Sequence, residues 1–177
     1  MGRALAWLIA VTVAAMCPQM VFAQAKEQSI LETITIDAAP DQVWAVAGDF
    51  AGLAKWYPLI ESSKLVLGRN GEVGCIRELT RLNGTKVEEK LIDFNPWDRT
   101  LTYTYAGGQP LSSDYFATLT IKDAGGGHSL VEWKARFKGL DYTVDDPARD
   151  EKLVRLLSGG YRKGLVSLKE KVEGTQP

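Results

Sequence analysis

Histidine and cysteine are scarce in this chain, and their scarcity excludes several kinds of catalytic and metal site. The 177 residues include one histidine, His128, and two cysteines, Cys17 and Cys75. His128 follows three glycines in an expected turn, so we interpret it as a surface residue. Because no second histidine is present, the chain has no good candidate for a Ser-His-Asp or Cys-His catalytic arrangement or for a His-based metal site. We therefore expect no metal and no cofactor.

The chain also has no excess of charge of one sign. It contains 21 Lys and Arg against 22 Asp and Glu, which gives a formal net charge of −1, and it has no basic run. A nucleic-acid-binding domain normally carries a basic patch, so nucleic acid is not an expected partner. An apolar content of 45% over 177 residues suits one compact domain.

The longest apolar run stands near the N-terminus and is too short to span a bilayer comfortably. It comprises Ala4–Ala15 and is preceded by one positive charge, Arg3. Val21-Phe22-Ala23 then offers a small-residue cleavage site, with Ala23-Gln24-Ala25 as the second candidate. A charge, an apolar run and a cleavage site in this order are typical of a secretory signal peptide, which we assign to residues 1–23.

Removal of this signal peptide would leave one domain, residues 24–177, which we expect to be soluble in the periplasm. Cys17 would leave with the signal, so the mature chain would keep only Cys75 and could form no internal disulfide. No second apolar run is long enough to cross a bilayer, and we therefore expect no membrane span after signal removal.

Hydrophobic periodicity and turn residues predict mostly strands, followed by one long helix. Two short helical pieces, Asp41–Ala47 and Phe50–Trp56, follow the first strand, and Asn83-Gly84 is the kind of pair that closes a tight hairpin. Because hairpins join neighbouring strands, we expect an antiparallel sheet. The seven predicted strands are Ser29–Asp37, Leu65–Leu67, Gly74–Arg81, Thr85–Phe94, Thr100–Ala106, Leu111–Lys122 and Ser129–Lys138.

The C-terminal helix is predicted to begin at Asp145-Asp146-Pro147 and to run to about Glu173. Apolar residues recur along it at helical spacing and mark one buried face. Gly159, Gly160 and Gly164 interrupt this pattern, although each glycine costs about 1 kcal/mol of helix stability relative to alanine. We expect these glycines where the sheet or a ligand must come close to the helix.

Four segments stand in a characteristic order along the chain: DAAPDQVWAVAGDFAGLAKWYPLIESSKL, EEKLIDFNPWDRTLTYTYAGG, SDYFATLTI and VEWKARF. These segments, together with the order of the predicted elements, resemble the START-like superfamily, also called SRPBCC. Within it, the chain resembles the exported MxaD-like proteins that are encoded among methanol-oxidation genes. The resemblance implies an α+β helix-grip fold, in which a seven-stranded antiparallel sheet wraps around the long C-terminal helix and two short helices after the first strand support that helix.

The resemblance also implies a cavity between the sheet and the helix. Abscisic-acid receptors of this superfamily place an acidic residue and a tyrosine in their pocket, at positions that match Glu89 and Tyr115. Period-two alternation puts Glu89 on the same strand face as Val87 and Leu91, which agrees with an inward position. The alternative is a solvated carboxylate in the charged run 86–90, since charged residues are seldom buried unpaired.

Four further residues are expected to line the cavity, and for a fifth residue two arguments disagree. Tyr103 and Tyr105 share strand faces with apolar neighbours, and Tyr57 stands where the receptors have a pocket lysine. Gly160 is expected to border the cavity from the helix. The resemblance also places Glu132 in the cavity, whereas the apolar alternation of its own strand places it outward, unless a bulge intervenes.

These observations predict an exported, non-enzymatic protein that binds a small hydrophobic molecule in the cavity or a protein partner. The resemblance to MxaD-like proteins implies an accessory role in periplasmic methanol oxidation, with methanol dehydrogenase or its cytochrome as the partner. The alternative is a polyketide cyclase or aromatase in which Glu89 and Tyr115 act as acid and base. An export signal weighs against this alternative, because polyketide intermediates are made in the cytoplasm.

Overall fold

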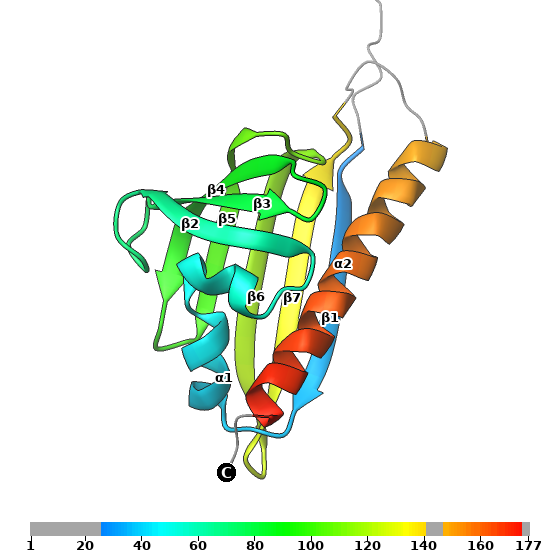
Figure 1. The fold of residues 1–177 in the computed structure, drawn as a ribbon. Helices are drawn as coiled ribbons and strands as arrows, with labels where there is room; N and C mark the ends of the chain where they lie inside the picture. The colour runs from blue at the N-terminus through cyan, green and yellow to red at the C-terminus, as the bar shows by residue number, and fades with distance from the viewer. Residues whose placement is uncertain (1–25, 141–146, 175–177) are drawn as a thin grey trace, which may run out of the picture.

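The computed structural model describes residues 26–140 and 147–174 of the chain. It contains one seven-stranded sheet, two short helices after the first strand and one long C-terminal helix (Figure 1). No helix within these two ranges is long and apolar enough to cross a membrane. The elements in chain order are β1 (Gln28–Ile36), α1 (Pro40–Ala47), the 3-10 helix η1 (Phe50–Lys55), β2 (Ile60–Leu67), β3 (Ile76–Arg81), β4 (Lys86–Asn95), β5 (Thr100–Gly108), β6 (Ser113–Gly125), β7 (His128–Lys138) and α2 (Pro147–Glu173).

All neighbouring strands of the sheet are antiparallel. Strands β2 to β7 follow one another as neighbours and β1 pairs with β7, so the order across the sheet is β1-β7-β6-β5-β4-β3-β2. Helix α2 lies along one face of the curved sheet and runs beside β1 (Figure 1). This arrangement confirms the α+β helix-grip fold that the sequence predicts.

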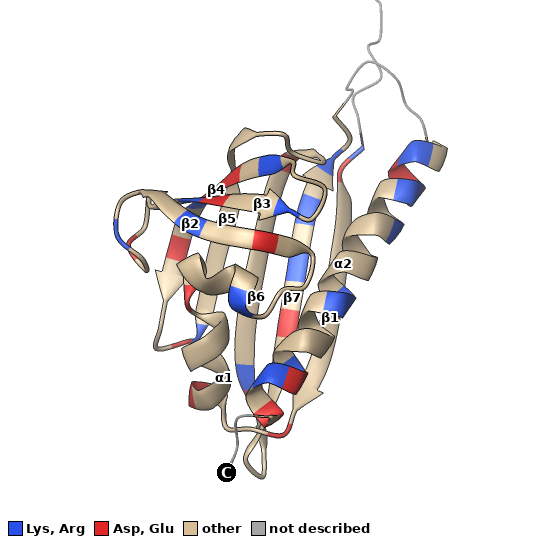
Figure 2. Ribbon diagram, in the orientation of Figure 1, with Lys and Arg blue, Asp and Glu red and all other residues tan. Residues whose placement is uncertain are grey.

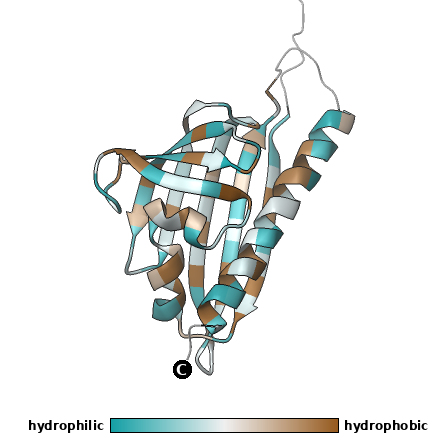
Figure 3. Cartoon of the chain, viewed as in Figure 1, coloured by the Kyte–Doolittle hydropathy of each residue, from teal (hydrophilic) through white to brown (hydrophobic). Residues whose placement is uncertain are grey.

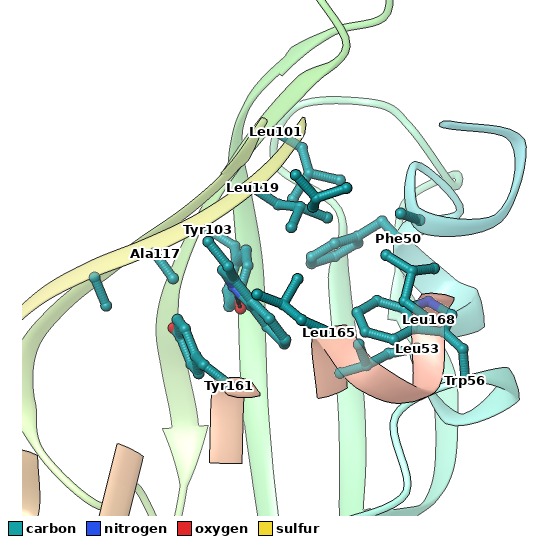
Figure 4. Packing of buried hydrophobic residues seen from close by; sticks show 14 of the residues in the cluster. Phe50, Leu53, Trp56, Leu101, Tyr103, Ala117, Leu119, Tyr161, Leu165 and Leu168 are labelled. Atoms are coloured by element: carbon teal, nitrogen blue, oxygen red, sulfur yellow. Dashed lines mark hydrogen bonds between the residues drawn. The ribbon is translucent and has the colours of Figure 1, made fainter. Parts of the chain in front are cut away.

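Alternating burial along the strands separates the core from the outer face of the sheet. In β7, Val131, Trp133 and Phe137 are at most 2% exposed, and Glu132, Lys134 and Arg136 alternate with the buried residues on the other face. Figure 3 shows this pattern as hydrophobic and hydrophilic bands along the strands, and Figure 2 shows charges of both signs interspersed over the ribbon. Helix α2 contributes Leu165 and Leu168 to the same core (Figure 4).

The two short helices contribute aromatic residues to this core, and a glycine after α1 leaves room for one of them. Helix α1 is followed by Gly48, where a Cβ atom would lie 2.6 Å from Cε2 of Trp44. Phe50 begins η1 and is completely buried, in the same cluster as Leu168 of α2 (Figure 4). Trp44 packs on Phe94, with ring centroids 5.5 Å apart. Phe50 therefore belongs to the core, and Trp44 packs against it.

Helix α2 is attached to β1 by polar contacts as well as by its apolar face. Ser158 Oγ donates to the Glu32 carboxylate, and Arg162 donates from Nε and Nη2 to the two oxygens of Glu32, at 3.0 Å each. The hydrogen bond from Arg162 holds the pKa of Glu32 below its ordinary value, although partial burial acts in the opposite direction. Further along the helix, Lys169 Nζ donates to the Thr35 carbonyl at 3.0 Å.

The structure differs from the predicted boundaries most clearly at the second strand. The sequence predicts Leu65–Leu67, whereas β2 begins at Ile60. Strand β2 lies at the edge of the sheet, and its residues 61–64 are polar and mostly exposed. The hydrophobic alternation that would identify a strand is therefore weak there. The register between β2 and β3 also shifts twice, which interrupts the period of two further.

Candidate functional site

A cavity of about 280 Å³ lies between α2, the segment after η1 and the inner face of the sheet. This volume is close to the lower end of the range for small-molecule sites, roughly 300–1,000 Å³. The cavity reaches the surface, because Leu111 and Leu156 line it and are 36% and 58% exposed. Most of the lining is apolar, and the side chains with polar groups are Tyr57, Arg81, Asn83, Glu89, Tyr103, Tyr105, Tyr115, Trp133 and Tyr161.

A row of polar side chains crosses the inner face of the sheet from β3 to α2. The strand register pairs Arg77 of β3 with Glu89 of β4, and Glu89 with Tyr105 of β5. Directly paired residues on one face have Cβ atoms roughly 5 Å apart, so their side chains are neighbours. Tyr105 stacks on Tyr115 of β6, with ring centroids 4.2 Å apart. The row ends on α2, where the hydroxyls of Tyr115 and Tyr161 are hydrogen-bonded to each other.

Arg77 and Glu89 form a buried ion pair in this row. Arg77 is 3% exposed and Glu89 is 5% exposed. Arg77 donates from Nε and Nη2 to Glu89 Oε2, at 2.9 and 2.6 Å, and from Nη1 to the Phe50 carbonyl. The Arg77 guanidinium carbon also lies 4.0 Å from the centre of the Phe50 ring. Glu89 is therefore a paired core carboxylate, and the alternative of a solvated carboxylate is wrong.

The ion pair uses only one of the two oxygens of Glu89. Both bonds from Arg77 end on Oε2, and no hydrogen bond reaches Oε1 from residues 26–140 or 147–174. Glu89 lines the cavity whereas Arg77 does not, so Glu89 is the member of the pair that a molecule in the cavity can meet, and Oε1 is its unbonded oxygen. Tyr57 and Tyr105, whose side chains each carry a hydroxyl, also line the cavity.

The tyrosine hydroxyls around the cavity are held in their neutral form. Burial raises the pKa of Tyr103 to about 12, and the negative charge of Glu89 adds to this effect. Trp133 Nε1 donates to the Tyr103 hydroxyl at 3.0 Å. Since these phenols do not ionise near neutral pH, they offer hydrogen-bond donors and acceptors but no phenolate base. Burial also raises the pKa values of Tyr57, Tyr105, Tyr115 and Tyr161.

The three glycines of α2 have three different surroundings. A Cβ atom on Gly159 would meet nothing within 4 Å, and one on Gly160 would lie 2.9 Å from the Tyr57 hydroxyl. On Gly164 it would lie 2.7 Å from Tyr57 Cδ2 and 2.9 Å from Trp133 Cζ3. Gly164 thus lets the helix approach two aromatic rings, whereas Gly160 borders the cavity. Close packing therefore explains the glycine at position 164, and the adjacent cavity explains the glycine at position 160.

The structure places one predicted site residue, Glu132, outside the cavity. The prediction that Glu132 faces inward is wrong, because the residue lies on the outer face of β7 and pairs with Lys122 Nζ at 2.7 Å. The register of β7 is regular around it, with no bulge to turn the side chain inward. The apolar alternation of the strand therefore indicated the correct side. The predicted residues that do line the cavity are Tyr57, Glu89, Tyr103, Tyr105, Tyr115 and Gly160.

The sequence-based prediction missed Arg77, which holds Glu89 in place. Arg77 stands two residues after Cys75 and two before Leu79, and both of these residues are buried, so the same alternation places Arg77 inward. Its charge argued against that position, because charged residues are rarely buried without a partner. Opposite charges at inward positions of two neighbouring strands are the pattern that would have identified the pair.

The described part of the chain holds no group of three or more His, Cys, Asp or Glu side chains that could bind a metal ion. The side chain of His128 is 47% exposed and pairs with Asp37, which agrees with a surface residue. Cys75 is free and buried.

The fold and its internal cavity define a helix-grip protein of the SRPBCC class. More specifically, the chain belongs to the family described as polyketide cyclase/dehydrase and lipid transport, whose model matches residues 27–173. No curated protein matches the chain.

Similar solved structures include the protein XoxI from Bacillus cereus. XoxI is 31% identical over 82% of this chain and 95% of its own, with a TM-score of 0.71. An uncharacterised protein from Bacillus thuringiensis is 30% identical over 82% of this chain and 99% of its own, with a TM-score of 0.70. Ara h 8.0201 is 18% identical over 85% of this chain and 100% of its own, with a TM-score of 0.63, and shares the fold.

Proposed function

We propose that the protein binds a small, largely apolar molecule in the cavity beneath α2 and is a non-enzymatic accessory protein of methanol oxidation. The cavity itself supports the proposed ligand binding. It is a mostly apolar space of about 280 Å³, and Glu89 in its lining has one carboxylate oxygen without a hydrogen bond. A domain that needed only a stable core would fill such a space with side chains, because protein interiors are densely packed.

The proposed setting is the periplasm. It rests on the predicted signal peptide of residues 1–23, which lie outside the described residues, and on the resemblance to the exported MxaD-like proteins. The similarity to XoxI supports this grouping. The proposed protein partner is methanol dehydrogenase or its cytochrome.

The cyclase alternative has less support in the geometry of the cavity. It requires Glu89 and Tyr115 to exchange protons with a substrate. Burial raises the pKa of Tyr115 well above its ordinary value, so its hydroxyl is both a weak acid and, at neutral pH, not a base. Glu89 is held by two hydrogen bonds from Arg77. We therefore favour a binding role for this cavity.

Binding is tested with N-phenyl-1-naphthylamine, a neutral dye that fluoresces in apolar surroundings. The wild-type protein should enhance its fluorescence saturably at one site per chain. Gly160→Leu should abolish this enhancement, because the new side chain enters the cavity beside the Tyr57 hydroxyl. Gly159→Leu is the matched control, since it adds the same side chain one residue away in open space.

Equal dye binding by wild type and Gly160→Leu, or no saturable binding by the wild type, would contradict a ligand-binding cavity. The accessory role is tested separately by deleting the gene and measuring growth on methanol. The wild-type gene and Gly159→Leu should restore growth, whereas Gly160→Leu should not. Growth on methanol that is unaffected by the deletion would reject the methanol-oxidation part alone.

A further inference from the structure

The polar end of the cavity presents a fixed hydrogen-bond acceptor. Arg77 fixes the orientation of the Glu89 carboxylate through two bonds to Oε2, and its third bond goes to the Phe50 carbonyl. Glu89 is buried, and its second oxygen is unbonded within the described ranges. An ionised carboxylate only accepts hydrogen bonds, so a group of a bound molecule that pairs with Oε1 must be a donor.

The charges around the cavity disfavour an anionic ligand. The positive charge of Arg77 is matched by Glu89, and Arg77 does not line the cavity. Among the described residues of the lining, Arg81 is the one cationic side chain, and its Nη1 already donates to Thr85 Oγ1 at 3.1 Å and to the Gln109 carbonyl at 2.9 Å. A ligand carboxylate beside Oε1 would place two like charges together in an enclosed apolar site, where water screens them poorly.

We propose that the cavity selects neutral molecules that carry an O–H or N–H donor at one end, such as alcohols and phenols, and discriminates against carboxylates of the same shape. The donor binds Glu89 Oε1, and the nearby hydroxyls of Tyr57 and Tyr105 accept or donate a second bond. This inference rests on the proposed function, because it describes the ligand class of the same cavity.

The test compares three molecules with one bicyclic skeleton that suits a cavity of about 280 Å³. 2-Naphthol has a donor, 2-methoxynaphthalene has only an acceptor, and 2-naphthoate is an anion at pH 7. Isothermal titration calorimetry should show 2-naphthol binding about tenfold or more tightly than either of the others, as expected for a hydrogen bond to a charged group.

Two variants locate the cause of this preference. In Arg77→Met/Glu89→Leu, which removes both charges together, the affinities for 2-naphthol and 2-methoxynaphthalene should agree within about threefold, because the acceptor is gone. Gly159→Leu, whose added side chain meets open space, should keep the wild-type preference. Thermal melts check that each variant is folded. If the double variant is unstable, the binding of the three molecules to the wild-type protein still tests whether the cavity prefers a donor.

The outcomes separate this inference from the proposed function. Equal binding of all three molecules by the wild type, or tighter binding of 2-naphthoate, would overturn the inference and leave a ligand-binding cavity in place. A donor preference that persists in the double variant would overturn the role of Glu89. If none of the three molecules binds and the naphthylamine dye also fails to bind, the proposed function is rejected and this inference with it.

Discussion

Replacing glycines of α2 with alanine tests how closely the helix packs over the cavity wall. At Gly159 the added methyl group meets nothing within 4 Å, so the change should act only through helix propensity. Alanine is favoured over glycine in a helix interior by about 0.8–1.0 kcal/mol. Gly159→Ala should therefore raise the free energy of unfolding by up to about 1 kcal/mol.

At Gly164 the same methyl group meets two aromatic rings. It would lie 2.7 Å from Tyr57 Cδ2 and 2.9 Å from Trp133 Cζ3, whereas carbon atoms in normal contact are about 3.5–4.0 Å apart. The rings cannot move freely, because Trp133 also stacks on Tyr161 with centroids 4.0 Å apart. Overpacking of this kind costs about 1–3 kcal/mol, which exceeds the gain in propensity.

The free energies of unfolding of Gly159→Ala and Gly164→Ala should thus differ by about 1–3 kcal/mol, with Gly164→Ala the less stable. For a domain of this size, 1 kcal/mol corresponds to roughly 2–4 °C in the midpoint of thermal unfolding. Circular dichroism melts of the two variants and the wild type measure the difference directly. If Gly164→Ala melts at or above Gly159→Ala, the helix does not approach the rings as described, and the width of the cavity is wrong.

Three further predictions concern the buried pair, the tyrosines and export. Glu89→Leu should lower the free energy of unfolding, measured in urea, by about 3–5 kcal/mol, because it leaves the Arg77 charge buried without a partner. Arg77→Met/Glu89→Leu should recover most of that loss. Equal losses of stability in the two variants would contradict a coupled pair. While the protein is folded, the cavity tyrosines should remain un-ionised even at about pH 11, as measured by the absorbance of phenolate at 295 nm. Their pKa values are raised in the folded state, with Tyr103 at about 12, so their contribution to stability should be complete below pH 10 and should be lost as the pH rises above it. The sequence has six tyrosines and five of them line the cavity, so ionisation of more than one tyrosine per chain at pH 10, with native near-ultraviolet circular dichroism, would refute their burial. N-terminal sequencing of the periplasmic fraction should find Gln24 or Lys26 first, and a retained initiating methionine would reject export.

The fold could be predicted from the sequence because its elements have strong local patterns. The turn residues between strands and the alternation in β7 are clear in the sequence, and the structure has the same elements. The first half of β2 could not be predicted, because an edge strand that is polar on most positions has no hydrophobic period to detect. Its pairing with β3 is a tertiary property.

The site could be predicted only as far as strand faces allow. Alternation placed Glu89 and Tyr115 inward correctly, and it contradicted the resemblance at Glu132, where it was the better guide. The partner of Glu89 was missed because Arg77 is twelve residues away in sequence and meets it only through the register of β3 and β4. The sequence could not distinguish Gly160 from Gly164 for a similar reason. Their neighbours are distant in sequence, so only the packed structure shows which of the two glycines lies against the aromatic rings.

A crystal structure of the protein with 2-naphthol would show whether the cavity binds a hydrogen-bond donor through Glu89. Electron density for the ligand should lie between α2 and the sheet, with its oxygen about 2.5–2.7 Å from Glu89 Oε1, the distance of a hydrogen bond from a hydroxyl to a carboxylate. A cavity that remains without ligand at saturating concentration, or a ligand bound only on the outer face of the sheet, would contradict this mode of binding.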